Sequence, residues 1–274
     1  MAARRRSVLV GIFSAVVLGL VPALTGATTL PTTPLDFSTD AQYDSNFKEG
    51  TTNTAILRNA GGFLSATGAD VHGAAAYDTS ATGGAGGQGG AGGNDANGDL
   101  QNFAISSSIY TANRSSHTLI GYFLRLDANE QHGYLATVSL DTTAATNNLT
   151  FRVYRDVGLD LADDGTTHAP NIAPVFSSTL TAAYSAVTNY PFKVSIQGDT
   201  ISFDFRSGLG TASYTDPTPI TGPGQVGVYL HASNFDANTN VRIDDFTITP
   251  VPEPGAASIG LIVAGWRLIR RRRV

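Results

Sequence analysis

The sequence predicts an all-β protein, an antiparallel β-sandwich preceded by an N-terminal signal peptide and followed by a short C-terminal transmembrane helix. Three observations lead to this prediction. Apolar residues along the body of the chain recur with period two and almost never with the period of a helix. Turn residues separate these alternating runs at short intervals. Apolar stretches flanked by arginines stand at the two ends of the 274-residue chain.

The clearest alternating pattern predicts a β-hairpin. The runs 192–197 and 200–205 are joined by Gly198-Asp199, a two-residue turn of the type that begins with glycine. Such a turn fixes the register of the two strands. The expected cross-strand pairs are Phe192 with Phe205, Val194 with Phe203 and Ile196 with Ile201 on one face, and Lys193 with Asp204 on the other. Both faces agree on one register.

Further strands are predicted wherever a short apolar run is bounded by turn residues. They are expected at Phe103–Ile105, Leu119–Leu126, Tyr134–Leu140, Leu149–Tyr154, Val226–Leu230 and Val241–Ile248. In the last of these, the apolar positions switch from odd to even numbers at Asp244-Asp245, which predicts a β-bulge. Strand spacing of this kind is typical of a sandwich or a jelly roll.

Residues 1–27 have the pattern of a secretory signal peptide. Arg4-Arg5-Arg6 precede an apolar stretch from Val8 to Leu20, and small residues follow as far as Ala27. The context after the arginines is a weak match to twin-arginine export. We therefore expect ordinary Sec export, with cleavage after Ala27 or Ala23.

The last segment, 251–274, carries three features in order. Val251-Pro252-Glu253-Pro254 forms a proline-rich linker, because proline removes backbone donors and fixes φ. The apolar run 255–269 would rise about 22 Å as a helix, short of a hydrocarbon core of about 30 Å. Trp266 and the cluster Arg270-Arg271-Arg272-Arg273 suit a membrane interface, with the arginines on the cytoplasmic side.

These features resemble the PEP-CTERM sorting signal of Gram-negative envelope proteins. The resemblance covers the Val251–Pro254 motif, the short apolar helix and the arginine-rich end. It implies recognition by an exosortase-type membrane enzyme that cleaves at the motif, and release of the body to the cell surface or into exopolysaccharide. The alternative is an ordinary C-terminal membrane anchor.

The predicted body, 28–250, is one domain with a strongly acidic charge. The chain has 17 basic and 22 acidic residues, and eight of the basic ones lie in the two terminal segments, so the body with Glu253 has 9 − 22 = −13. Such a surface disfavours nucleic acid, which is bound through Lys and Arg, and favours divalent cations. Because the chain has no cysteine, disulfides and thiolate chemistry are excluded. Residues 83–98 are expected to form a glycine-rich flexible loop.

A second resemblance covers most of Asp36 to Ile248. It rests on Asp36-Phe37 at the start of the body, the hairpin at Gly198-Asp199, the Gly224–Tyr229 run and the closing Ile243–Phe246 run. These are similar to the concanavalin A-like (laminin G-like) jelly rolls of bacterial surface proteins. The resemblance implies that the first and last strands lie close together. It also implies a family in which many members bind glycans or calcium and some hydrolyse glycans.

Acidic loops supply candidate calcium ligands. Asp156, Asp160, Asp163 and Asp164 fall in one loop, where a hard cation with six to eight oxygen ligands would relieve their repulsion. The loop lacks the spacing of an EF-hand, and the alternative is a solvated acidic loop. Asp244-Asp245 is a second candidate, against an outward-facing polar pair at a bulge.

We expect no catalytic residues. The sequence has neither a nucleophile elbow nor a zinc-protease motif, and its five histidines are scattered. Glycosidases of the jelly-roll type need two carboxylates across the scissile bond. Before the C-terminal motif the only glutamates are Glu49 and Glu130, and neither has a carboxylate two or four residues away.

Three functions remain open: a non-catalytic polysaccharide-associated surface module, a purely structural envelope protein and a glycan-processing enzyme. The first is favoured. Because the body has no tryptophan, sugar stacking would depend on tyrosines. The candidates are Tyr122, Tyr134, Tyr154, Tyr214 and Tyr229.

Overall fold

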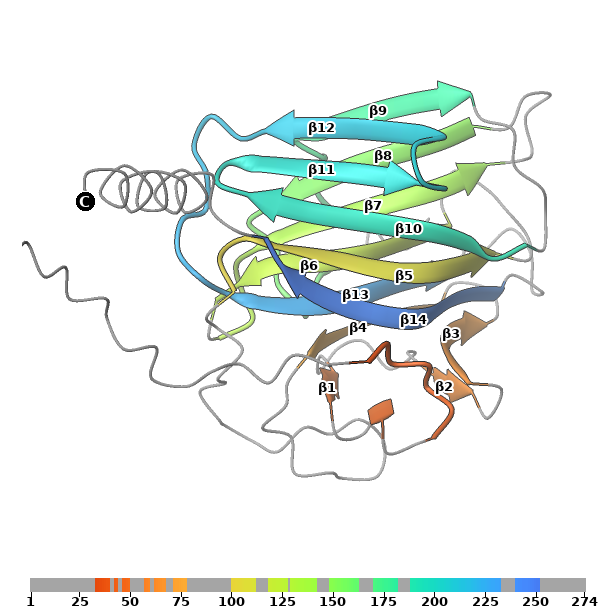
Figure 1. Cartoon of the computed structure of the whole chain (residues 1–274). Coiled ribbons are helices and arrows are strands. Elements are labelled where there is room, and N and C mark those ends of the chain that lie inside the picture. Colours follow the sequence, from red (N-terminus) through yellow and green to blue (C-terminus); the bar gives the residue numbers. More distant parts are fainter. Residues whose placement is uncertain are drawn as a thin grey trace, which may run out of the picture.

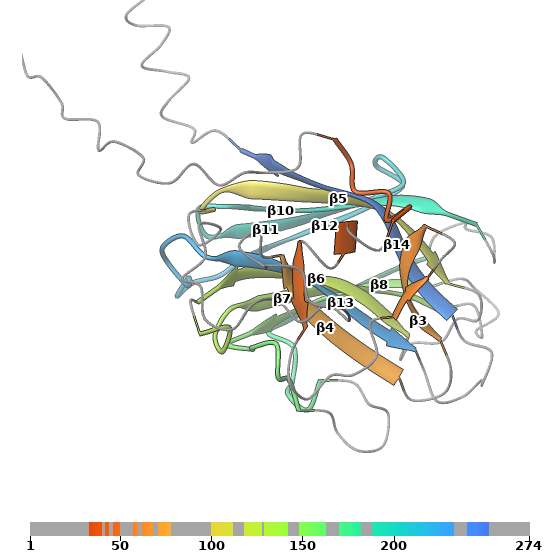
Figure 2. The same ribbon diagram turned by 90° about the horizontal axis from the view of Figure 1, so that it is seen from below.

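The computed structural model describes a sandwich of two antiparallel sheets, each of seven strands (Figure 1). The two layers are seen edge-on in Figure 2. The prediction of an all-β antiparallel sandwich is therefore confirmed. The described residues are 33–39, 42–43, 46–49, 57–59, 62–67, 71–77, 100–111, 118–127, 129–141, 148–162, 170–181, 188–232 and 240–251.

The first sheet is called sheet 1 and lies at the back in Figure 1. In spatial order its strands are β1 (Phe47–Glu49), β4 (Val71–Tyr77), β13 (Gln225–Ala232), β6 (Leu119–Leu126), β7 (Tyr134–Asp141), β8 (Asn148–Arg155) and β9 (Phe176–Thr181).

The second sheet, sheet 2, faces the viewer in Figure 1. In spatial order its strands are β12 (Gly210–Thr215), β11 (Thr200–Phe205), β10 (Tyr190–Gln197), β5 (Phe103–Thr111), β14 (Asn240–Pro250), β3 (Phe63–Thr67) and β2 (Leu57–Asn59). The chain passes repeatedly from one sheet to the other, for example from β4 to β5 and from β12 to β13, as in a jelly roll.

The predicted hairpin is confirmed as β10 and β11. Phe192 pairs with Phe205 and Lys193 with Asp204, in the expected register. Gly198 has a φ of 60°, a left-handed conformation that only glycine adopts without strain, and it begins the two-residue turn.

The six further predicted strands are all present as β5, β6, β7, β8, β13 and β14, most of them longer than expected. The sequence analysis did not identify β1 to β4, β9 and β12. The reason differs between them. β4 is rich in small residues, and because 73–77 are all buried it shows no alternation of apolar and polar side chains, whereas β9 and β12 are edge strands rich in Ser and Thr.

The bulge predicted in β14 is confirmed. The pairing of β14 with β5 shifts register between Asp244 and Thr247, and Asp245 has a φ of 54°. Phe246, just past the bulge, pairs with Leu35 at the start of the described body. The first and last parts of the sandwich therefore lie side by side, as the jelly-roll resemblance implied.

The core fills the space between the two sheets and is rich in stacked aromatic rings. Phe151 of sheet 1 stacks on Phe203 of sheet 2 with ring centroids 5.0 Å apart, and Phe47 meets Phe246 edge-on at 5.6 Å. A second, smaller cluster lies on the outer face of sheet 1, where Val157 and Leu159 pack against residues such as Phe123. Both faces of the centre of sheet 1 are consequently buried, whereas sheet 2 has one polar outer face.

Several predictions fall on residues that the structure does not describe: the signal peptide 1–27, the loop 83–98 and the segment from Pro252 to Val274. Val251, the first residue of the proposed sorting motif, follows β14, and its N–H donates to the Asn102 carbonyl at 2.9 Å. Within the described residues there is no helix of the length and hydrophobicity needed to cross a membrane.

Candidate functional site

Four of the five tyrosines considered for sugar contact are buried, so the exposure that this prediction required is wrong for these four. Tyr122, Tyr134, Tyr154 and Tyr229 are at most 4% exposed. Tyr214 is half-buried and packs against Phe176 with ring centroids 5.6 Å apart. These four lie on predicted strands, but on the inward faces or under the loops that cover sheet 1, whereas Tyr214 lies on β12, which was not predicted. The four buried rings cannot stack on a glycan.

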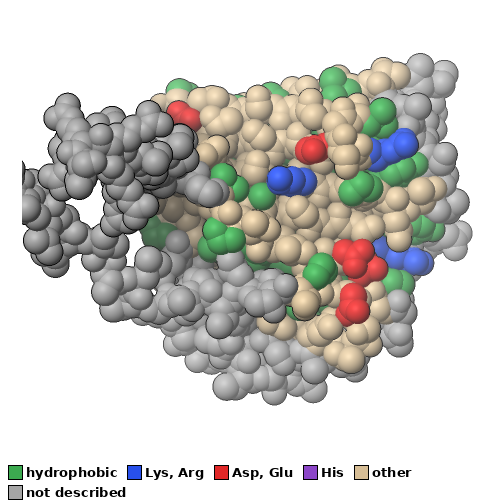
Figure 3. Space-filling model, in the orientation of Figure 1, with side chains coloured by type: hydrophobic (Ala, Val, Ile, Leu, Met, Phe, Trp, Pro, Cys, Tyr) green, Lys and Arg blue, Asp and Glu red, His purple; other side chains and the backbone are tan. Residues whose placement is uncertain are grey.

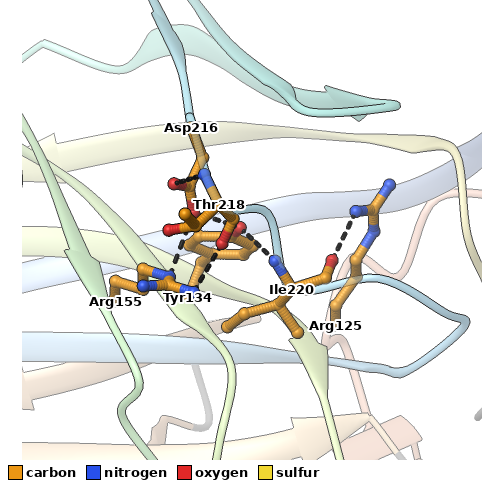
Figure 4. Close-up of polar contacts among 6 residues, drawn as sticks. All are labelled: Arg125, Tyr134, Arg155, Asp216, Thr218 and Ile220. Carbon is orange, nitrogen blue, oxygen red and sulfur yellow. Dashed lines mark hydrogen bonds and ion pairs between the residues drawn. The ribbon is translucent and has the colours of Figure 1, made fainter.

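Tyr134 instead belongs to a buried polar cluster that we call the clamp, shown in Figure 4. It surrounds Asp216, the first residue after β12, whose side chain is 2% exposed. The Tyr134 hydroxyl donates to Asp216 Oδ2 at 2.7 Å, and Arg155 Nε lies 3.1 Å from the same oxygen. The N–H of Thr218 donates to Oδ1 at 2.9 Å, and the N–H of Ile220 donates to the Tyr134 hydroxyl at 2.8 Å.

Arg125 extends the clamp towards the other end of the connection between β12 and β13. It has a left-handed φ of 52°, and its guanidinium donates to the carbonyl of Ile220 at 2.8 Å and to that of Gln101 at 2.8 and 3.0 Å. Gly224 then passes directly over its backbone. A Cβ on Gly224 would lie 2.5 Å from the Arg125 carbonyl carbon, so only glycine fits there.

The pKa values of Asp216 and Tyr134 are shifted in opposite directions, and both shifts stabilise one protonation state of the clamp. Burial alone would raise the pKa of Asp216, but hydrogen bonds from Tyr134 and Thr218 and the charge of Arg155 hold it below its ordinary value. Burial, together with the hydrogen bond to Asp216, raises the pKa of Tyr134 to about 12. Asp216 is therefore ionised and Tyr134 is neutral across the physiological pH range. Since Asp216 is closed off from solvent, the clamp fixes the β12–β13 connection across the strand ends of sheet 1.

The proposed calcium ligands are only partly described. Asp156 is exposed, and its Oδ1 lies 2.8 Å from His132 Nδ1. Asp160 is also exposed, while Asp163 and Asp164 lie outside the described residues. In the part of the chain that the structure describes, no group of three or more His or acidic side chains is arranged to hold a metal ion. Calcium at this loop stays a prediction.

Asp244 and Asp245 flank the bulge in β14. The backbone N–H of Asp245 donates to Asp244 Oδ1 at 2.7 Å. Burial, with the nearby carboxylates of Asp245 and Asp36, raises the pKa of Asp244. These three carboxylates are therefore close enough to affect one another, but among the described residues they do not form a metal-holding group, and a cation at Asp244-Asp245 stays a prediction.

The two glutamates of the body are engaged in structural contacts. Both Glu130 oxygens accept hydrogen bonds from Lys48 Nζ at 2.9 Å, and Glu130 is buried. Glu49 Oε1 accepts a hydrogen bond from the Tyr43 hydroxyl at 2.6 Å. Neither carboxylate is therefore placed to act as a general acid or base towards a ligand.

The outer side of sheet 2 offers an open polar surface, which we call the hydroxyl face. It consists of the outward side chains of four neighbouring strands, β5, β10, β11 and β12, and most of these side chains end in a hydroxyl group. Figure 3 shows the same side of the molecule, where tan, uncharged atoms predominate; charged groups stand singly over its middle, and acidic groups gather beside a basic one near its lower right edge. The members are Ala104, Ser106, Ser108, Tyr110, Pro191, Lys193, Ser195, Gln197, Thr200, Ser202, Asp204, Thr211, Ser213 and Thr215.

Regular pairing arranges these side chains in rows across the strands. One row runs Thr211, Asp204, Lys193, Ser106, and the next runs Ser213, Ser202, Ser195. Adjacent strands are about 4.8 Å apart, and successive rows, two residues on, are about 7 Å apart. Thr200 Oγ1 and Thr215 Oγ1 lie 3.2 Å apart in a third row. The result is a two-dimensional array of donors and acceptors on a rigid support.

Lys193 and Asp204 form the charged centre of the hydroxyl face. They are directly opposite each other on β10 and β11, as the hairpin register predicted. Asp204 Oδ1 accepts a hydrogen bond from the Gly208 N–H at 2.6 Å, which fixes the orientation of the carboxylate. One cation and one anion cancel, so this face is neutral on a body whose formal charge is −13.

Sequence reasoning located the hairpin but missed this surface. Thr200, Ser202 and Asp204 are the polar members of the alternation whose apolar members identified β11. The polar half of the pattern was therefore available in the sequence. What was not available is that β12, which lacks a strong apolar signal, continues the same rows at the edge of the sheet.

No protein-family model and no curated protein matches this sequence. Solved structures with a similar fold include a carbohydrate-binding module from Bacillus subtilis, which is 13% identical, with 75% of this chain and 96% of that chain covered and a TM-score of 0.46. A β-glucanase from Bacillus licheniformis is 7% identical, with 80% and 97% covered and a TM-score of 0.48. A legume lectin-like domain from Entamoeba histolytica is 8% identical, with 77% and 92% covered and a TM-score of 0.47. At these identities the likeness concerns the fold alone.

Proposed function

We propose that this protein is an exported, non-catalytic β-sandwich that associates with extracellular polysaccharide through the hydroxyl face of sheet 2. The observation that carries the proposal is the neutral array of Ser and Thr side chains, set in rows on a rigid sheet. A hydroxyl group both donates and accepts hydrogen bonds, which suits a ligand whose surface is also made of hydroxyl groups. A flat, open sheet is suited to a polymer rather than to a small molecule, which would require a concave pocket.

The engaged carboxylates support a binding role over hydrolysis. Glycoside hydrolysis needs two carboxyl groups on either side of one bond. Glu130 is buried against Lys48, Glu49 is bound by Tyr43, and Asp216 is enclosed in the clamp. On the hydroxyl face Asp204 stands opposite a lysine instead of a second carboxylate.

Both ends of the sequence support export to a polysaccharide-rich location. The signal peptide 1–27 directs the chain through Sec, and the segment 251–274 holds it at the inner membrane of a Gram-negative-type envelope until an exosortase-type enzyme cleaves at Val251–Pro254. The body is then released to the surface or the extracellular matrix. Calcium at Asp156–Asp164 is the one ion proposed for it.

Co-sedimentation of the body with polysaccharide from its own producing cell tests this function. We expect the protein to pellet with the polysaccharide, and the reducing ends of the polymer to stay constant. Ser202→Arg places a long charged side chain in the centre of the hydroxyl face and should abolish pelleting. Ser177→Arg is the matched control, since Ser177 is exposed on β9 of the other sheet.

Each contrary result points to a different alternative. Release of new reducing ends would establish a glycan-processing enzyme instead. Failure of the wild-type protein to pellet would favour a purely structural envelope protein. Equal pelleting of both arginine variants would show that the hydroxyl face is not the contact surface.

A further inference from the structure

We infer that the ligand of the hydroxyl face is a neutral polysaccharide, and that Lys193 and Asp204 together bind its hydroxyl groups at the centre of the face. This inference rests on the proposed function and deepens it by naming the class of polymer and the two side chains that contact it. Both parts follow from the charges on the hydroxyl face, from the contacts of the described arginines and from the formal charge of the body in the sequence.

The charge balance of the surface disfavours an acidic polymer. The hydroxyl face has one cation, Lys193, and one anion, Asp204, while the body as a whole is at −13. A polyanion approaching this face would be repelled by the body and would gain no net attraction from the surface that it reaches. A neutral polymer meets no such barrier.

The arginines whose side chains the structure describes could otherwise recognise an acidic sugar, but each contacts other residues of the protein; of these arginines only Arg206 is exposed. Carboxylate and sulfate groups are bound best by the planar fork of arginine. Arg125 donates to two backbone carbonyls, Arg155 binds Asp216, and Arg152 donates to Ser139. Arg242 lies over the rings of Phe63 and Tyr110, 4.2 and 4.7 Å from their centroids, and Arg206 lies over Tyr190. The guanidinium groups with described side chains are therefore committed to protein contacts.

The central pair is suited to two neighbouring sugar hydroxyls. The Lys193 ammonium offers three donors, and the Asp204 carboxylate is acceptor-only. One hydroxyl can accept from the lysine while its neighbour donates to the aspartate, and such charge-assisted hydrogen bonds are stronger than those between neutral groups. Ser106 and Thr211, which end the same row, supply further contacts on either side. The Gly208 N–H holds the carboxylate in place before the ligand arrives.

Fractionation of the producing cell's polysaccharide by anion exchange separates the two classes of polymer. We expect the body to bind the unretained, neutral fraction and not the retained, acidic one, with chelator present throughout. Binding to the neutral fraction should change little between about 0.1 M and about 1 M salt, over which the Debye length falls from about 10 to about 3 Å.

Two conservative variants test the central pair. Asp204→Asn keeps the oxygen that accepts from Gly208 but removes the charge, and Lys193→Met keeps the apolar stem but removes the donors. Each should weaken binding to the neutral fraction about tenfold. Thermal melts should match the wild type for both, and Ser177→Ala on the other sheet should bind as the wild type does.

The outcomes separate this inference from the proposed function. Binding to the acidic fraction alone would overturn the neutral ligand while leaving a polysaccharide-binding protein. Wild-type affinity in both variants would overturn the role of the central pair. Binding to neither fraction would overturn the inference and the proposed function together.

Discussion

At the scale of single residues, Asp216 shows how the fold keeps a buried charge. Its carboxylate is almost inaccessible, yet three groups bind it: the hydroxyl of Tyr134, the N–H of Thr218 and the guanidinium of Arg155. A buried charge without such partners would shift its pKa until it became neutral. Here the partners outweigh burial and lower the pKa of Asp216.

Asp216→Asn should lower the free energy of unfolding by about 2 kcal/mol, because it leaves Arg155 without its counter-charge. The partial exposure of Arg155 keeps the effect below that of a fully buried pair. Urea unfolding at neutral pH measures the change. Asp199→Asn in the exposed hairpin turn is the control and should be close to the wild type. A change for Asp216→Asn as small as that of the control would contradict the clamp.

The stability difference between the wild type and Asp216→Asn should depend on pH. Because the folded pKa of Asp216 lies below its unfolded value of about 3.9, its stabilisation is fully present above that value. It is lost as pH falls through the folded pKa. The difference in unfolding free energy between the wild type and Asp216→Asn should therefore be constant near neutral pH and shrink below about pH 4. A difference that stayed constant into strong acid would show that the charge of Asp216 contributes nothing.

Asp244 should show the opposite sign. Burial and the neighbouring carboxylates raise its folded pKa, so its ionised form opposes folding at neutral pH. Asp244→Asn keeps an acceptor for the Asp245 N–H and should raise stability at neutral pH. The gain should disappear as pH falls below the unfolded pKa. Denaturant unfolding between neutral pH and the unfolded pKa measures this gain in stability. A variant that is less stable than the wild type at neutral pH would contradict the argument.

Calcium at the Asp156–Asp164 loop is tested by stability. If the loop binds Ca²⁺, a hundredfold excess over the dissociation constant stabilises the body by about 2.7 kcal/mol. Melts with millimolar Ca²⁺ and with chelator should then differ, and the difference should vanish in the Asp160→Asn/Asp163→Asn double variant. Identical melts would leave a solvated acidic loop.

At the scale of elements, strands with an alternating pattern or with an apolar run bounded by turn residues were predictable from sequence, and the other strands were not. The β10–β11 hairpin, the bulge in β14 and the central strands of sheet 1 carry a local signal that tertiary contacts only reinforce. β4 pairs with β13, which is distant in sequence, and β9 is an edge strand that pairs only with β8, so neither strand has a strong local signal. The four buried tyrosines failed as site predictions because which face of a strand is covered depends on segments elsewhere in the chain.

Alanine substitutions at two glycines should separate the free-energy cost of a positive φ from that of a steric clash. Gly198→Ala should cost about 1 kcal/mol, because φ is positive there but a Cβ would meet nothing within 4 Å. Gly227→Ala in β13 should cost about 2–3 kcal/mol, because its Cβ would lie 2.7 Å from the Ala75 carbonyl oxygen in the neighbouring strand. Denaturant unfolding of both variants gives the ranking. The reverse order would contradict the packing of β13 against β4.

At the scale of the whole molecule, the fold and the proposed function depend on different features of the sequence. The two sheets and their covered core follow from alternation, whereas the proposed task follows from the one broad face that stays polar and neutral. This face lies on strands that sequence reasoning identified only in part. The proposed destination of the protein rests on the sequence of the two terminal segments, nearly all of which lies outside the described residues.

Processing at the C-terminal motif predicts the mass of the mature protein. Because the proline-rich linker, the short apolar run and the arginine cluster occur in order, we expect the exported form to end near Val251–Pro254 and to lack Arg270–Arg273. Intact-mass spectrometry of extracellular material measures this. Recovery of the C-terminal arginine peptide from that material would indicate an ordinary membrane anchor instead.

The position of β14 has a consequence for the order in which the body can fold. This strand is the last to be synthesised, yet it lies in the interior of sheet 2, between β5 and β3, and pairs with Leu35 near the beginning of the chain. A chain that crosses a membrane from its N-terminus delivers β14 after every other strand, so sheet 2 stays open, with two strand edges exposed, until residue 250 has crossed. Only the few residues of the proline-rich linker separate β14 from the apolar segment. If the chain is exported and anchored as proposed, the sandwich can close only at the end of translocation, while the chain is still held at the membrane and before it is cleaved.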